Sequence, residues 1–303
     1  MSQAVLFMAY GSPNNLDEVE PYFADVRGGR PTTPEAVEEL RARYAAIGGR
    51  TPLLDITREL AARTQAELGP DYRVHVGMRH WHPYIREAVA DILGERPARI
   101  TALALAPHYA RMSVGAYRDA LEQALAAHPG PLPPVDVIER WHDQPGFRQL
   151  IADRIGTALA GFSAAAPVRV VFSAHSLPQR ILTWRDPYPD ELRESAAAIA
   201  ELAGLPPEGW ELAFQSAGGT REPWLGPDLV DVIARLAEQG YRQGLSVPFG
   251  FGCEHREVLY DIDIEAQAAA RRRGLTLRRI AMPDADPAFA RVLADLVRSR
   301  TVQ

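Results

Sequence analysis

The stretch Val168-Arg-Val-Val-Phe-Ser-Ala-His175-Ser-Leu-Pro178 decides the fold. Its apolar, β-branched run from Val168 to Phe172 is typical of a buried strand in a parallel sheet. Small polar residues around His175 end this predicted strand, and Pro178 prevents simple continuation of a strand or a helix. Ligands of open α/β sheets bind just beyond the carboxyl ends of the strands. The stretch therefore places His175 where a ligand could bind, although a loop histidine held by backbone hydrogen bonds is the commoner outcome.

Strand, loop and helix alternate along the rest of the chain. Apolar runs predict strands at 4–9, 72–78, 99–106, 135–138, 168–172, 210–215, 244–247 and 275–280. Amphipathic segments predict helices between them. This order predicts an α/β fold of two similar, doubly wound, Rossmann-like domains, each with a parallel sheet and helices on both faces. We expect domains at 1–163 and 164–303, with a ligand cleft between them.

The composition is that of a globular protein: 47% of the 303 residues are hydrophobic, 24% are charged, and the net charge is -6. No basic block points to nucleic acid, and no run approaches the roughly 18 apolar residues of a membrane span. The segment from Met1 to Tyr10 lacks the cationic start of a signal peptide and predicts a strand. The single cysteine, Cys253, excludes an internal disulfide and an all-cysteine iron–sulfur cluster. These features predict a cytoplasmic enzyme.

An acidic segment follows the strand at 244–247, and its pattern predicts a helix over 253–273. Glu257, Asp261 and Glu265 are spaced i, i+4, i+8, so a helix would stack three carboxylates on one face. Like charges at this spacing repel one another, so we expect compensating partners. Two interpretations stay open: a solvated surface stripe, or a ladder of oxygen ligands for a hydrated divalent cation.

A histidine and a carboxylate thus come from two strand ends of the second half. Both groups accept protons, and both bind metals. The pattern therefore predicts metal or proton chemistry in the interdomain cleft, but spacing alone does not name the substrate.

Several motifs resemble one known family. Phe172-Ser-Ala-His175-Ser-Leu-Pro178 is similar to the signature of the ferrochelatases, which insert ferrous iron into a porphyrin, and His255-Arg-Glu257-Val-Leu-Tyr-Asp261-Ile-Asp-Ile-Glu265 resembles their second motif. The remaining matches are Tyr10-Gly-Ser-Pro, Tyr44-Ala-Ala-Ile-Gly-Gly, Leu105-Ala-Pro-His-Tyr, Asp186-Pro-Tyr-Pro-Asp190 and Pro223-Trp-Leu-Gly-Pro-Asp228. They cover nearly the whole chain in the family's order. The resemblance implies that the cleft binds a porphyrin.

The resemblance also implies roles for single residues. His175 accepts pyrrole protons or binds iron, and Glu257 faces it and assists. Asp261 and Glu265, with Arg43 nearby, resemble the family's outer cation site, which relays hydrated metal inward. Iron is then a substrate, and we expect neither an organic cofactor nor an iron–sulfur cluster.

The choice of porphyrin also rests on the resemblance. Tyr10 matches a tyrosine of the bacterial enzymes that use coproporphyrin III. Arg27, Arg43, Thr51 and Tyr117 match positions that hold propionates in that group, and arginine forms bidentate pairs with carboxylates. The resemblance therefore favours a coproporphyrin III ferrochelatase that makes Fe-coproporphyrin for haem biosynthesis, with protoporphyrin IX as the alternative substrate. We expect a monomer without a nucleic-acid partner or an integral membrane segment, in transient contact at most with the next haem-pathway enzyme.

Other functions are open. A sirohydrochlorin chelatase shares the fold but usually lacks the His175 motif. In a non-catalytic porphyrin or haem carrier, Tyr10 would be an axial ligand and Glu257 would matter little. A periplasmic-type binding protein is disfavoured by the expected absence of a signal peptide.

Two segments depart from the family pattern. The run Phe249-Gly-Phe-Gly-Cys253-Glu254 is unusual, and we expect Cys253 to be inert. Trp81 is bulkier than expected, and its neighbour His80 contacts the porphyrin edge or is structural.

Overall fold

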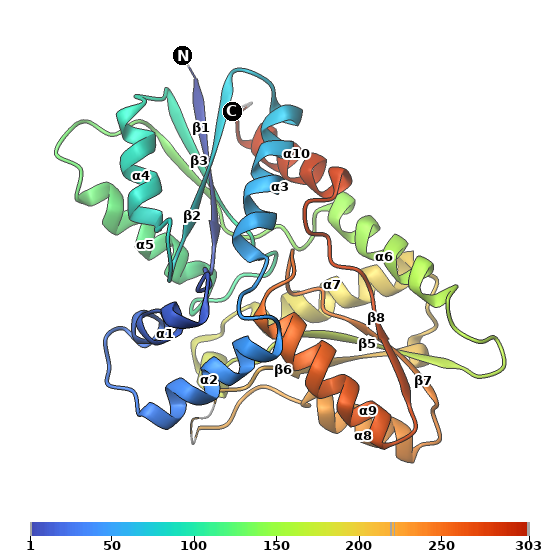
Figure 1. The fold of residues 1–303 in the computed structure, drawn as a ribbon. Helices are drawn as coiled ribbons and strands as arrows, with labels where there is room; N and C mark the ends of the chain where they lie inside the picture. The colour runs from blue at the N-terminus through green and yellow to red at the C-terminus, as the bar shows by residue number, and fades with distance from the viewer. Residues whose placement is uncertain (1, 219, 221, 302–303) are drawn as a thin grey trace. The chain divides into compact units, whose positions relative to one another are not determined.

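The computed structural model describes residues 2–218, 220 and 222–301. Within these residues the chain forms two four-stranded sheets whose neighbouring strands are all parallel (Figure 1). The predicted α/β fold with two similar parallel sheets is confirmed. In the described part of the chain, no helix combines the length and apolar character needed to cross a membrane.

The described residues group into two compact units. The first unit contains residues 2–141, 253–256 and 284–301, and the second contains the described residues of 142–252 and 257–283. In this grouping the helix at 145–159 belongs to the second unit and the last helix belongs to the first. The predicted domains at 1–163 and 164–303, and the predicted cleft, stay predictions.

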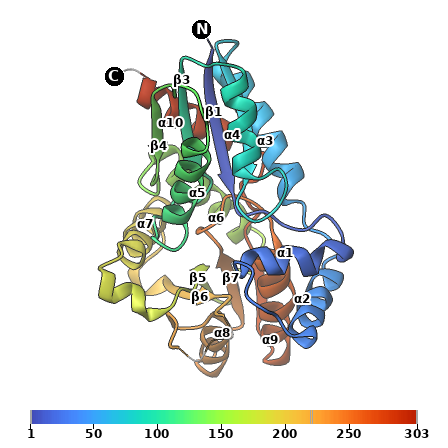
Figure 2. The same ribbon diagram turned by 90° about the vertical axis from the view of Figure 1, so that its left-hand side faces the viewer.

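The sheet of the first unit has the strand order β2-β1-β3-β4. Helices α4 and α5 cover one face of this sheet, and α3 and α10 lie on the other (Figure 2). The bounds are β1 Gln3–Ala9, η1 Leu16–Glu18, α1 Val19–Val26, α2 Pro34–Ala46, α3 Leu53–Leu68, β2 Tyr72–Met78, α4 Ile85–Gly94, β3 Arg99–Ala104, α5 Val114–Ala126, β4 Val135–Ile138 and α10 Pro287–Thr301.

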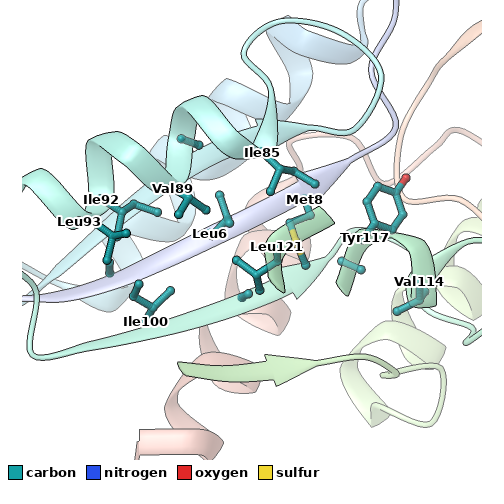
Figure 3. Packing of buried hydrophobic residues seen from close by; sticks show 14 residues of the cluster. Leu6, Met8, Ile85, Val89, Ile92, Leu93, Ile100, Val114, Tyr117 and Leu121 are labelled. Carbon is teal, nitrogen blue, oxygen red and sulfur yellow. The ribbon is translucent and has the colours of Figure 1, made fainter. Parts of the chain in front are cut away.

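The core of this unit follows the two-residue period of its strands. Alternate side chains of β1, among them Leu6 and Met8, point to α4 and α5, where Ile85 and Leu121 meet them (Figure 3). The intervening β1 residues Val5 and Phe7 are fully buried as well. Burial on both faces explains why the strand is continuously apolar.

The second sheet repeats this order as β6-β5-β7-β8. Helices α6 and α7 lie on one face, and α8 and α9 pack on the other (Figure 1). The bounds are α6 Pro145–Leu159, β5 Val168–His175, η2 Gln179–Trp184, α7 Tyr188–Leu202, η3 Pro207–Gly209, β6 Trp210–Gln215, α8 Leu229–Glu238, β7 Gln243–Val247, η4 Glu257–Ala266, α9 Gln267–Arg272 and β8 Thr276–Arg279.

Two predicted boundaries were wrong in ways that matter for the site. Strand β5 does not end at Phe172 but continues to His175, because Ser173 and Ala174 are buried and pair with β6. The acidic segment is not a regular α-helix from residue 253 onward: η4, over Glu257–Ala266, is a π-helix, and α-helix follows only from Gln267. π-Helical segments are rare and often mark functional sites.

Candidate active site

His175 is the last residue of β5, where its backbone pairs with Gln215 of β6. Two hydrogen bonds of Ser176 then fix the backbone where the chain leaves the sheet. The amide of Ser176 donates to the carbonyl of Gln215 at 2.7 Å, and the Ser176 hydroxyl donates to the carbonyl of Leu225 at 2.7 Å. The imidazole stays 30% exposed. The backbone of His175 is thus fixed at the carboxyl end of β5, while its ring remains accessible.

The contacts of the imidazole define its tautomer. Its Nδ1 lies in hydrogen-bond contact with the carbonyl oxygen of Ser176. Because a carbonyl only accepts, Nδ1 must carry the hydrogen, and in the neutral ring Nε2 keeps its lone pair. Nε2 lies 3.5 Å from Oε1 of Glu257. The ring therefore presents a basic nitrogen next to a carboxylate.

Glu257 begins the π-helix, and its side chain is 16% exposed. Beside His175 it would stabilise an imidazolium, so the two side chains together can accept and hold a proton. The same two atoms suit a metal, because neighbouring ligands about 2.1 Å from a tetrahedral cation lie about 3.4 Å apart. The pair is equipped for proton transfer and for transient binding of a divalent cation.

Tyr188, the first residue of α7, contacts the backbone of His175. Its side chain is buried, and its hydroxyl donates to the carbonyl oxygen of His175 at 2.9 Å. Burial raises the pKa of the Tyr188 phenol well above its usual range, and the nearby Glu257 charge raises it further. The phenol therefore stays a hydrogen-bond donor. We did not predict this contact; the only signal was the match of Asp186-Pro-Tyr-Pro-Asp190 to the family.

The carboxylates of the π-helix differ in their surroundings. Asp261 is buried and accepts a hydrogen bond from the Ser216 hydroxyl, whereas Glu265 is exposed. Asp263 forms a two-point ion pair with Arg279, with both N–O distances at 2.9 Å. Of the three carboxylates that the charge pattern stacks, Glu257 thus lies beside His175 and Asp261 accepts a hydrogen bond from Ser216. Among residues 2–218, 220 and 222–301, no three His, Cys, Asp or Glu side chains form a cluster that could hold a metal.

The first unit carries a second histidine at a strand end. His80 follows β2, and its ring lies against that of Tyr10, which follows β1, with 4.7 Å between the ring centroids. His80 Nδ1 lies 2.8 Å from a carboxylate oxygen of Asp25. Burial lowers the pKa of His80, and the hydrogen bond to Asp25 offsets part of this effect. His80 is 7% exposed and Tyr10 is 40% exposed. This burial favours the structural role for His80.

The bulky Trp81 is explained by packing. Its indole nitrogen donates to Glu18 at 2.7 Å, and its ring lies edge-on to Tyr22. A Cβ at Gly11, where φ is +94°, would lie only 2.9 Å from the backbone nitrogen of Trp81. Glycine after Tyr10 therefore lets the two loops approach.

The other predicted porphyrin-binding residues lie in the first unit in varied surroundings. The guanidinium of Arg27 donates to the carbonyl of Pro31 at 3.2 Å, and that of Arg43 pairs with Glu39 at 2.7 Å. Both side chains are half-buried. Their roles stay predictions.

Thr51 and Tyr117 are both buried. The Thr51 hydroxyl donates to Ser12 at 2.9 Å. Tyr117 packs in the core beside α4, but its hydroxyl lies at one end of the cluster and points away from the aliphatic side chains (Figure 3). Their roles also stay predictions.

Cys253 belongs to the first unit as well. Desolvation, together with the nearby Asp284 and Glu254, raises the pKa of its thiol. A protonated thiol is a poor nucleophile and a poor metal ligand, which favours the inert role.

The fold resembles that of solved chelatases. The sirohydrochlorin chelatase SirB from Bacillus subtilis subspecies spizizenii, solved in complex with cobalt, aligns over 99% of this chain and 95% of its own, with a TM-score of 0.58 and 11% identity. At this identity the likeness shows the fold alone.

Sequence comparison is more specific. The ferrochelatase family model matches residues 2–301. A ferrochelatase from Herpetosiphon aurantiacus is 50% identical over 300 residues, covering 97% of both chains. A coproporphyrin III ferrochelatase from Geobacillus kaustophilus is 37% identical over 98% of this chain and 95% of its own. The chain belongs to the ferrochelatase family and is thus an enzyme of the metal chelatase type, a lyase.

Proposed function

We propose that this enzyme inserts ferrous iron into coproporphyrin III and releases Fe-coproporphyrin for haem biosynthesis. The observation that carries the proposal is the pair formed by His175 and Glu257, with a basic nitrogen 3.5 Å from a carboxylate at a strand end. Relatives 35–37% identical, among them that from Geobacillus kaustophilus, are named coproporphyrin III ferrochelatases, which supports the choice of porphyrin.

The reaction replaces two pyrrole N–H protons by one Fe²⁺, so two protons must leave as the metal enters. His175 Nε2 accepts a pyrrole proton, and the carboxylate of Glu257 stabilises the resulting imidazolium. The imidazolium passes this proton to Glu257 or to water, and the neutral imidazole that results accepts the second pyrrole proton. A histidine suits this task because an ordinary imidazole titrates near neutral pH.

The π-helix supplies a route for the metal. Glu265 is exposed, Asp261 is buried, and Glu257 is next to His175. Oxygen ligands in this order take up hydrated Fe²⁺ at the surface and hand it to the pair formed by His175 and Glu257.

The four propionates of coproporphyrin III require cationic and hydroxyl partners, for which we propose Arg27, Arg43, Thr51 and Tyr117. Tyr10, 40% exposed, contacts the macrocycle. We further propose that the enzyme works as a cytoplasmic monomer that passes its product to the next haem-pathway enzyme by transient contact.

The test is anaerobic turnover with ferrous iron, offering coproporphyrin III and protoporphyrin IX separately and following the loss of porphyrin fluorescence. A clear preference for coproporphyrin III is expected. A preference for protoporphyrin IX would overturn the choice of porphyrin and leave the chelatase in place, and tight binding without metal insertion would indicate a carrier.

A matched pair of variants tests the propionate contacts. Arg43→Gln removes a guanidinium that pairs with the glutamate four residues earlier, and Arg63→Gln removes a guanidinium in the same relation to Glu59. Only Arg43→Gln is expected to raise KM for coproporphyrin III.

A further inference from the structure

The peptide unit between His175 and Ser176 is held at both of its polar ends. Its N–H donates to the carbonyl of Gln215 at 2.7 Å, and its carbonyl accepts the hydroxyl of Tyr188 at 2.9 Å. The first bond comes from the neighbouring strand, as expected at the end of a parallel ladder. The second comes from a side chain in the next helix, so the sheet alone does not account for it.

The next peptide unit carries the carbonyl of Ser176, which accepts Nδ1 of the His175 ring. The orientation of this carbonyl depends on the peptide before it and on the Ser176 hydroxyl, which donates to Leu225. A rotation of the His175–Ser176 peptide would therefore turn the tautomer-setting carbonyl away from Nδ1.

Tyr188 is itself firmly placed. It opens α7, its amide donates to the Asp186 carboxylate at 3.1 Å, and its side chain is only 7% exposed. A buried hydroxyl in such a setting forms its hydrogen bond with little loss of side-chain freedom, because packing already holds the ring.

We propose that Tyr188 is a positioning residue whose hydroxyl fixes the backbone at His175, so that the ring keeps its hydrogen on Nδ1 and directs the Nε2 lone pair to the reacting centre. This proposal rests on the proposed function, in which Nε2 accepts the pyrrole protons. Tyr188 acts through His175 and does not contact the substrate.

The Tyr188→Phe variant keeps the ring and removes only the donor. The carbonyl of His175 then lacks this hydrogen bond, and the peptide gains freedom to rotate. Rotation populates the second tautomer, in which Nε2 carries the hydrogen and cannot accept a proton. We expect kcat to fall about tenfold, the effect of losing one typical hydrogen bond. KM for the porphyrin should stay within about twofold, because the groups proposed to bind it are unchanged.

The test combines kinetics with ¹⁵N NMR of histidine-labelled protein at a pH where the imidazoles are neutral. The spectrum of His175→Ala identifies the His175 signals among the eight histidines. Wild type should show one tautomer with hydrogen on Nδ1, and Tyr188→Phe should show a mixture together with the lower kcat. Tyr241→Phe, which alters a partly buried tyrosine of the core that α8 and α9 form in the same unit, should change neither.

Ser176→Ala gives a second route, because it releases the same carbonyl by removing the bond to Leu225. It should also mix the tautomers, so the proposal stays testable if Tyr188→Phe folds poorly. A single Nδ1–H tautomer in either folded variant would overturn the proposal, even if kcat falls. If His175→Ala keeps full turnover, the proposed function fails, while the tautomer spectra still decide what Tyr188 does.

Discussion

Each unit has a histidine at the carboxyl end of a strand, but the surroundings of the two histidines differ. His80 follows β2 in the first unit and meets a carboxylate, Asp25, at Nδ1, and it is 7% exposed. His175 is the last residue of β5 in the second unit, and its side chain is 30% exposed. Its Nδ1 donates to a backbone carbonyl, and its Nε2 lies next to the carboxylate of Glu257. The same strand order thus carries a buried, paired histidine in one unit and an accessible, basic one in the other.

The comparison shows that the position of a histidine at a strand end does not define its task. The decisive feature is which ring nitrogen already forms a hydrogen bond within the protein. A backbone acceptor at Nδ1 leaves Nε2 as a base or a metal ligand. Burial against Asp25 favours a packing role for His80, whose ring contacts that of Tyr10.

The largest effect on turnover should come from replacing His175, and replacing His80 provides the comparison. His175→Ala should lower kcat for ferrous insertion by about a hundredfold to ten-thousandfold, the usual contribution of a general base. Its melting temperature should change little, because the side chain is accessible. His80→Ala should instead lower the melting temperature and keep turnover within about tenfold, because it removes a buried ring. Equal losses of turnover in both variants would contradict the proposal that His175 is catalytic and His80 is structural.

A smaller effect is expected at the carboxylate. Glu257→Gln keeps the size of the side chain but removes the charge that stabilises a protonated His175, so kcat should fall about tenfold to a hundredfold. Glu222→Gln, which alters a carboxylate paired with Arg180 in the same unit, is the control and should be neutral. Steady-state rates with saturating iron measure both, and a fully active Glu257→Gln would remove the carboxylate from the mechanism.

The metal route predicts a still smaller change. Asp261→Asn should raise KM for Fe²⁺ a few-fold and leave KM for the porphyrin unchanged, because it removes one oxygen ligand charge from the relay. Asp263→Asn is the matched control, since Asp263 is already paired with Arg279. Titrations of iron at fixed porphyrin distinguish the two, and identical KM values for iron would sink the relay.

The smallest effect concerns stability against pH. Because the pKa of His80 is lowered in the folded state, the unfolded chain binds more protons at this residue once the pH falls below about 6.5. Stability is thus fully present above the unfolded pKa and declines as the pH falls through the folded pKa. Between pH 7.5 and 5.5, His80→Asn should lose roughly one to a few degrees less of its melting temperature than wild type. A steeper acid decline in the variant would contradict this sign.

Much of the fold could be predicted from the sequence, because both sheets are built from apolar runs bounded by turn residues. The extent of β5 could not, since Ser173 looks like a loop residue and is buried only because β6 pairs beside it. The π-helix also gave no signal, because its hydrogen-bond spacing leaves no clear mark on the apolar period.

The site was predicted less completely than the fold. His175 and Glu257 carry ionisable groups and stood out by type. Tyr188 did not, because its part depends on where its hydroxyl meets a backbone carbonyl, which no side-chain pattern encodes. Similarly, the burial of Thr51 and Tyr117 depends on tertiary packing.

We infer that the reactive nitrogen belongs to His175 and not to His80. The most direct test is the position of iron in an anomalous-scattering map of crystals exposed to ferrous iron without oxygen. We expect iron bound to Nε2 of His175 and to the carboxylate of Glu257. Iron bound at His80 and Asp25, with none at His175, would contradict it.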